Sequence, residues 1–378
     1  MKRFYRILIL LIVAFVGLNT TVHSKDFTNY ISVKKTVHKT FEDILEIHCD
    51  GNFFDVSIIG EETKTTDING KIDGEFKSLL GKGNFDININ FKKEKKTLKI
   101  WIDAPQNISM KNSIVKLKII TGKNCNVIVR NSSGNASVSN LNTYKIKVNT
   151  SSGDIDCNSL TSKSPMSIKS ISGFIKAQNL SSKNVTIDSS SGDQNIESIQ
   201  GDLNAKSISG SIIAKQIKGN ATLKSSSGDL KVSEVSLNLT TNSISGNQVH
   251  SKIKENTNIE SSSGDINLFH ANNNVRVKSI SGDIEIGDSE GKFYVRSTSA
   301  PIQCIGIKIT EESSFNSVSG DILCRFRNTS KDLKFQLLST SGDLEAGRTR
   351  KERKLYTNEG NILIKGNTTS GNQTYQFL

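Results

Sequence analysis

The stretch from Ser207 to Asp229 reads SISGSIIAKQIKGNATLKSSSGD and contains one full period of a repeat that runs through most of the chain. Both ends of this stretch carry a short polar motif, Ser-x-Ser-Gly-Asp or a variant of it, around Gly210 and Gly228. Glycine accepts a left-handed backbone that a Cβ would oppose, and Ser and Asp side chains bond to backbone groups at bends. Between the motifs, apolar residues recur two positions apart, which is strand periodicity. The stretch therefore predicts short strands joined by corners.

The motif repeats at a nearly fixed spacing. Its glycine recurs at Gly134, Gly153, Gly173, Gly192, Gly210, Gly228, Gly246, Gly264 and Gly282, is replaced by Ala300, and returns at Gly320, Gly342 and Gly360. From Gly192 to Ala300 the position of the motif advances by the same interval of 18 at every step. Such a period is typical of a solenoid, in which each unit buries its apolar face against its neighbours. We predict an all-β fold, a parallel β-solenoid with coils of about 18–20 residues.

Two features of the repeat leave alternatives open. A second row of turn residues, nine positions after the first glycine, holds Gly201, Gly219, Gly291 and Asn273. Two corners per period suit two or three short strands per coil, although an antiparallel meander would also use two turns. The middle residue of the motif alternates, as in Ser190, Ile208, Ser226 and Ile244, and this pattern would also fit a coil twice as long, with a period of 36 and four corners.

We assign a structural corner role to the recurring glycines and to the aspartates that follow them. These residues are Gly134, Gly153, Gly173, Gly192, Gly210, Gly228, Gly246, Gly264, Gly282, Gly320, Gly342, Asp154, Asp193, Asp229, Asp265, Asp283, Asp321 and Asp343. An enzyme on a solenoid would need a few acids or bases collected on one face. Because the aspartates belong to the repeat, the corner role explains them without catalysis, and we expect neither catalytic residues nor a cofactor.

Metal binding is also not expected from the corner motif. A period of 18 is twice nine, and nonapeptide rolls bind calcium through Gly-Gly-x-Gly-x-Asp turns. Here each corner supplies one carboxylate, well short of the six to eight oxygens that calcium takes. His38, His48, His250 and His270 are scattered, and His250 falls in an apolar column, where a core or rim role is the simpler interpretation.

The ends of the chain differ from the repeats. Residues 1–24 combine Lys2, Arg3 and Arg6 with an apolar run and a small-residue end at Ser24, which predicts a cleaved secretory signal rather than a permanent anchor. Residues 25–120 alternate like strands without the motif, and we interpret them as irregular first coils and an N-terminal cap. Regular repeats follow over 121–344, and residues 345–378 are expected to form the last coil and a C-terminal cap.

Charge and cysteine content set further limits. The chain carries 49 Lys and Arg against 37 Asp and Glu, a formal charge of +12. This excess favours anionic partners, but the basic runs 92–96 and 348–354 lack interleaved aromatics, so we expect solvated faces and no nucleic-acid partner. Five cysteines are an odd number. Cys304 and Cys324 fall at one position of successive repeats and would suit either a disulfide or two buried thiols.

Repeated corners such as Ser225–Asp229 and Ser279–Asp283, behind a signal peptide, resemble those of the bacterial putative-adhesin family, secreted β-strand-repeat proteins of unknown function related to head GIN domains. The resemblance covers residues 40 to about 370. It implies a right-handed, single-stranded β-helix at the cell surface or in the periplasm, and it supplies no catalytic residues. The chain departs from the pattern at Phe174, which stands in place of Asp, and at Ala300 and Pro301, which stand in place of Gly and Asp.

The sequence thus favours a non-enzymatic, adhesin-like envelope scaffold that is not an integral membrane protein after signal cleavage. Stacked coils would repeat the same exposed groups about every 4.8 Å, so weak contacts with an anionic glycan or another cell-surface polymer can add by avidity. The alternatives are a glycan-active lyase or hydrolase, and an envelope protein that assembles through its end coils.

Overall fold

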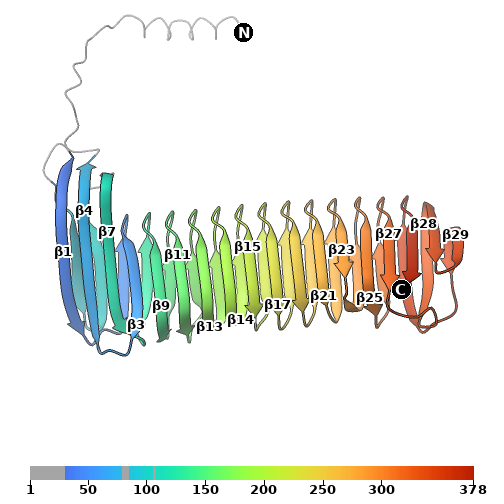
Figure 1. The fold of residues 1–378 in the computed structure, drawn as a ribbon, viewed down its shortest axis with the longest axis horizontal. Helices are drawn as coiled ribbons and strands as arrows, with labels where there is room; N and C mark the ends of the chain where they lie inside the picture. Colours follow the sequence, from blue (N-terminus) through green and yellow to red (C-terminus); the bar gives the residue numbers. More distant parts are fainter. Residues whose placement is uncertain (1–29, 79–84, 105–107) are drawn as a thin grey trace, which may run out of the picture.

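The computed structural model describes residues 30–78, 85–104 and 108–378. Within these residues, regular secondary structure consists of strands alone, and they stack into the elongated rod shown in Figure 1. Strand pairing along the rod is parallel from β8 to β27. The prediction of an all-β parallel solenoid is therefore confirmed. The predicted signal peptide, residues 1–24, lies outside the described residues.

Each coil of the rod contains two strands. The strands are β8 (Asn126–Asn131), β9 (Ala136–Thr143), β10 (Ile146–Asn149), β11 (Ile155–Ser162), β12 (Met166–Lys169), β13 (Ile175–Asp188), β14 (Gln194–Lys206), β15 (Ile212–Ile217), β16 (Ala221–Ser225), β17 (Leu230–Val235), β18 (Leu239–Ser243), β19 (Gln248–Ile253), β20 (Thr257–Ser261), β21 (Ile266–Ala271), β22 (Asn274–Ser279), β23 (Ile284–Gly287), β24 (Glu290–Arg296), β25 (Ile302–Ile309), β26 (Ser313–Asn316) and β27 (Ile322–Phe326). In β13 and β14 the two strands of a coil run together as one.

The register settles the coil length in the regular part of the rod. Leu230 pairs with Ile212 in the coil before it and with Gln248 in the coil after it, so the sequence position changes by 18 in each direction. The same offset joins β16, β18 and β20 on the other face. The period of the coil is therefore 18 and not 36, and the alternation of Ser and Ile in the motif distinguishes neighbouring coils.

Glycine occupies the corners because successive coils approach each other closely there. The left-handed backbone that we expected at these glycines is not observed, so that expectation is wrong. None of the corner-motif glycines from Gly134 to Gly342 has a positive φ, whereas Gly201 and Gly291 at the second corner do. A Cβ built on Gly228 would lie 2.1 Å from the carbonyl oxygen of Gly210, one coil earlier, and the same clash recurs along the column. Backbone stacks directly on backbone at each corner, so there is no room for a side chain.

The N-terminal end closes the rod with antiparallel strands. Its strands are β1 (Ile31–Glu42), β2 (Glu46–Gly51), β3 (Asp55–Glu61), β4 (Thr65–Ser78), β5 (Asn88–Glu94), β6 (Thr97–Asp103) and β7 (Ile108–Gly122). β2 and β3 form a coil that stacks in parallel on β8 and β9. The chain then turns back, and β6 and β7 pair in parallel with β2 and β3 on the outer side of this coil. The antiparallel strands follow: β5 pairs with β6 on one face, and β4 and then β1 extend the other face from β7.

At the C-terminal end, the order of the coils differs from the order of the chain. The strands are β28 (Leu333–Ala346), β29 (Thr349–Tyr356), β30 (Ile362–Thr368) and β31 (Gln373–Phe377). β30 and β31 insert between the coil of β26 and β27 and the long strand β28. Gly371, not Gly342, therefore stacks on Gly320, and Gly342 stacks on Gly371. Gly360, which we expected as the last corner, instead has a φ of +97° beside Leu333.

One continuous apolar core runs through the rod between the two strand faces. His250 and Gln248 interrupt it in a single coil and are fully buried. The Nε2 atom of His250 lies 3.2 Å from both the Thr241 hydroxyl and the Gln248 side-chain oxygen. All five cysteines are buried free thiols, and Cys304 pairs with Cys324 across adjacent coils. The alternative of two buried thiols is thus the one that the structure shows.

Candidate functional site: an axial groove

In successive coils from that of Gly134 to that of Ala300, the residue six positions after the corner has a left-handed backbone. These residues are Asn140, Ser159, Asn179, Ser198, Gln216, Glu234, Lys252, His270, Asp288 and Gly306, with φ between 46° and 69°. The left-handed residue lets two successive side chains face solvent before the next one turns inward, as Lys215 and Gln216 do before Ile217. The strand therefore bends at this position in each of these coils.

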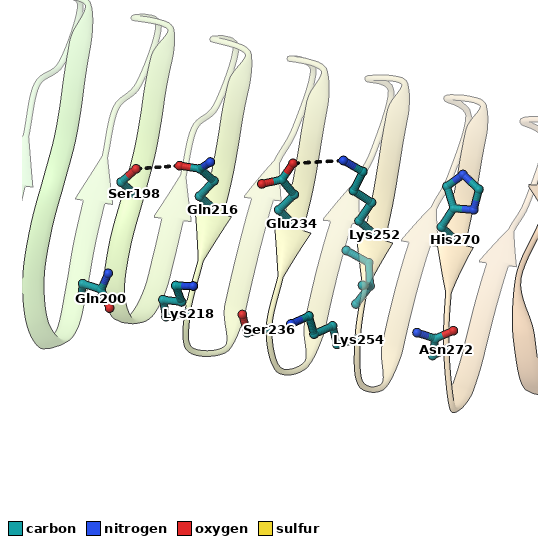
Figure 2. A pocket seen from close by; sticks show the side chains of 11 residues that line it. Ser198, Gln200, Gln216, Lys218, Glu234, Ser236, Lys252, Lys254, His270 and Asn272 are labelled. Atoms are coloured by element: carbon teal, nitrogen blue, oxygen red, sulfur yellow. Dashed lines mark hydrogen bonds and ion pairs between the residues drawn. The ribbon is translucent and has the colours of Figure 1, made fainter.

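The bend forms a groove that runs along the rod over five coils. Its walls are two rows of side chains, one at the left-handed position and one two residues later (Figure 2). The first row holds Ser198, Gln216, Glu234, Lys252 and His270, and the second holds Gln200, Lys218, Ser236, Lys254 and Asn272. The groove encloses about 540 Å³. Because the register is constant, each row runs parallel to the rod axis.

Hydrogen bonds and charges link successive coils along the first row. The Ser198 hydroxyl donates to the Gln216 side-chain oxygen at 2.8 Å, and the Lys252 ammonium donates to the Glu234 carboxylate at 3.2 Å. The bond from Lys252 lowers the pKa of Glu234. In the second row, Lys218 and Lys254 have no ion-pair partner within the described residues. The groove therefore presents hydroxyls, amides and unneutralised ammonium groups.

The corner residues predicted from the sequence lie along another edge of the rod. There an Asp or Asn side chain that follows a corner glycine accepts, in most coils, the backbone N–H of the equivalent residue one coil later. Asp193 accepts from Ser211, and Asp229 from Asn247, both at 2.8 Å. Asp154, Asp265 and Asp321 accept in the same way, and Asp343 donates its N–H to Asn372. Pro301 has no N–H, so the ladder is interrupted above Asp283.

A second ladder, which the sequence analysis missed, follows the other corner. The Asn238 side-chain oxygen accepts both the backbone N–H and the side-chain N–H of Asn256. The coils before and after this pair repeat the same two hydrogen bonds. The full ladder is Asp202, Asn220, Asn238, Asn256 and Asn274. The spacing of 18 residues between these asparagines was the available signal. Both ladders use their polar side chains to join coils.

The groove-lining left-handed positions were also missed. The signal was the interval of three between the apolar columns four and seven residues after the glycine, where a straight strand has intervals of two. Of the predicted histidines, only His270 lies in the groove, while His250 is in the core. Within the described ranges, no group of three or more His, Cys, Asp or Glu side chains could hold a metal ion. Nor does that part of the chain contain a helix able to cross a membrane.

A protein-family model matches nearly all of the rod. The family described as Toastrack DUF4097 matches residues 44–258 and, in a second alignment, residues 220–374. No curated protein matches the sequence.

Three of the solved structures that match the chain come from Clostridium and Parabacteroides species. A putative cell adhesion protein from Clostridium sporogenes is 12% identical over 92% of this chain and 100% of that one, with a TM-score of 0.18. A putative adhesin from Parabacteroides merdae is 12% identical over 78% and 96%, with a TM-score of 0.27. A putative lipid binding protein from Parabacteroides distasonis is 16% identical over 76% and 97%, with a TM-score of 0.29.

Proposed function

Since the chain belongs to the Toastrack DUF4097 family, we propose that it is a non-enzymatic, adhesin-like scaffold of the cell surface or envelope. It binds an acidic polysaccharide lengthwise in the axial groove. The observation that carries this proposal is the alignment of the two groove rows with the rod axis (Figure 2). A linear polymer laid in the groove meets a comparable set of groups at every coil.

The charges of the groove favour an anionic polymer over a neutral one. Lys218 and Lys254 stand two coils apart in one row, about 10 Å along the axis, and neither forms an ion pair within the described residues. Glu234 is the only carboxylate that lines the groove, and Lys252 already neutralises it. Acidic groups spaced regularly along a polysaccharide can therefore contact successive lysines, and attraction between them weakens as salt screens it.

Repetition determines how such a surface binds. A single hydroxyl, amide or ammonium contact in an open groove is weak, but contacts in successive coils belong to one bound chain and become effectively intramolecular. Affinity should then rise with polymer length until the polymer spans the five coils, about 19 Å from the first to the last. Secretion across the inner membrane, proposed from residues 1–24, would place the rod where such polymers occur.

The test compares the mature chain with a variant that lacks both unpaired groove lysines, Lys218→Gln and Lys254→Gln. Gln200 stands naturally in the same row, so the substitution fits the site. Binding to a panel of acidic polysaccharides and to neutral polymers of equal length is measured by calorimetry at low and high salt. The variant should bind the acidic polymers at least about tenfold more weakly.

The matched control is Lys95→Gln with Lys96→Gln, which removes the same charge from the exposed turn between β5 and β6. This control should bind like the wild type. An equal loss of affinity in both variants would mean that net charge alone causes the attraction, and it would contradict a groove site. Binding that does not change with polymer length, or release of new sugar ends during incubation, would also count against the proposal.

A further inference from the structure

The corner edge of the rod carries an exposed apolar ridge. In every second coil, the middle residue of the corner motif is aliphatic, and these residues are Ile171, Ile208, Ile244, Ile280 and Val318. Ile208 is 57% exposed and Ile244 53% exposed. In the coils between them the same position holds Ser or Thr. Phe174 is also exposed and directly follows the corner at Gly173, and Ile213 and Val249 are exposed on the strands that follow two of the corners.

This concentration is unusual for a surface that faces only water. Five of the 17 large exposed apolar residues in the described chain form the ridge, and a sixth, Phe174, directly follows one of its corners. Isolated exposed isoleucines need no explanation, but a row of them in register over nine coils marks an interaction surface. The structure also has no internal reason for isoleucine there, since serine forms the same corner in the alternate coils.

Two rows of charges flank the ridge, one on each side. The row that precedes the corner is mainly basic and contains Lys206, Lys224, Lys278 and Arg296, and it also includes the acidic residues Asp188 and Glu260. The row that follows the corner is acidic and contains Asp193, Asp229, Asp265 and Asp283. These four cations and four aspartates belong to exposed residues, and none forms an ion pair within the part of the chain that the structure describes. An apolar ridge between a basic and an acidic row is complementary to itself.

The two possible ways to join two such edges differ in charge. A twofold axis along the rod places two copies side by side and parallel, so the basic row of one copy lies next to the acidic row of the other. Coils of equal sequence then stand at equal height, and each ridge isoleucine meets its own counterpart. An antiparallel pair would instead place the basic row of one copy against the basic row of the other, and the acidic row against the acidic row, which is unfavourable.

The ends of the rod do not offer an alternative interface. The strands that close it, β1 and β5 at one end and β29 at the other, carry Lys34, Lys35 and Lys39, Lys92 and Lys93, and Arg350, Lys351, Arg353 and Lys354. Charged edge strands prevent pairing with a further strand, and basic ends repel one another. The two basic runs in the sequence thus lie on closing strands, and end-to-end assembly is disfavoured.

We propose that two copies of the chain associate in parallel, edge to edge, through the ridge of Ile171, Ile208, Ile244, Ile280 and Val318. Because the symmetry is twofold, the contact is closed and gives a dimer rather than a fibre. Each rod keeps its axial groove at the bend that follows the ridge by eight residues, so the dimer would carry two grooves with the same direction.

The first experiment is sedimentation velocity of the mature chain over a range of micromolar concentrations. The wild type is expected to form a dimer that weakens with salt. The variant Ile208→Ser with Ile244→Ser copies the corners at Ser190 and Ser226, so it should fold, and its dimer dissociation constant should rise at least about tenfold. Leu237→Ser, which removes a 41% exposed leucine from the other corner, is the control and should leave the dimer unchanged.

The second experiment tests orientation by oxidation of introduced cysteines. Ser190→Cys and Ser262→Cys are made as separate variants, and the five native cysteines are buried. In the parallel dimer each residue faces its own counterpart, so both variants should form disulfide-linked dimers. A monomer at all concentrations, a dimer that Ile208→Ser with Ile244→Ser leaves intact, or cross-linking of only one cysteine variant would each overturn the proposal.

Discussion

His250 should make the rod less stable in mild acid. Burial of this imidazole among apolar residues lowers its pKa from 6.5 to about 3. In the folded rod it stays neutral between these values, while in the unfolded chain it takes up a proton below pH 6.5. The unfolded state then binds more protons, so stability is unaffected above pH 6.5 and falls as the pH drops from 6.5 toward 3.

The size of the effect follows from the proton count. One proton corresponds to about 1.4 kcal/mol for each pH unit, so between pH 6.5 and pH 5 the rod should lose about 2 kcal/mol through this group. His250→Leu removes the titration, and leucine suits the column because Leu268 occupies it one coil later. When the pH is lowered from 7.5 to 5, the free energy of unfolding of the variant should therefore fall by about 2 kcal/mol less than that of the wild type.

The assay is urea unfolding followed by circular dichroism at both pH values, with the free energy of unfolding compared between the variant and the wild type. Restricting the range to pH 5 and above avoids most carboxylate titration. His270→Gln, which removes an exposed groove histidine, is the control and should keep the wild-type pH dependence. If His250→Leu and the wild type lose the same free energy, the neutral buried imidazole is refuted.

Further predictions concern the contacts between coils and the buried thiols. Asn238→Ala leaves hydrogen-bonding groups of Asn256 without their acceptor and should lower the free energy of unfolding by about 1–2 kcal/mol, whereas a change within about 0.3 kcal/mol would mean that the ladder contributes little. Gly228→Ala places a methyl group 2.1 Å from the Gly210 carbonyl oxygen and should cost about 1–3 kcal/mol, measured as a lower melting temperature; an unchanged value would contradict the close stacking. Burial raises the pKa of the Cys324 thiol well above its usual value. A thiol reagent at pH 8 should therefore label the folded rod slowly and all five cysteines after unfolding, and rapid labelling of the folded protein would argue against the buried assignment.

Much of the rod could be predicted because its repeat is regular. The constant spacing of glycine and the apolar columns determine which residues stack, and those columns form the core. The role of glycine was harder to infer, since a corner can need glycine for its backbone angle or for lack of space. Only the stacked structure shows that Gly228 faces the backbone of Gly210, so that space is the cause.

The features that were missed are marked more weakly in the sequence than the glycine corners. The left-handed positions hold residues as different as Ser198, Glu234 and Lys252, so no residue type marks them. At the C-terminal end, Gly360 follows Gly342 at a repeat-like distance, and spacing alone cannot show that the chain turns back. Tyr375 is fully buried and packs against Phe326 with ring centroids 6.1 Å apart, which helps to hold the inserted coil in place.

The stacking of the coils is tested most directly by the distance between two spin labels in one groove row. Gln200→Cys and Asn272→Cys place the labels at equivalent positions of two coils, four coils apart along the axis. Stacked coils predict a narrow distribution, measured by electron paramagnetic resonance, that is centred at about 19 Å. A distance of half that value, as a coil with twice the period would give, or a broad distribution, would contradict the stacking on which the groove and the ridge both depend.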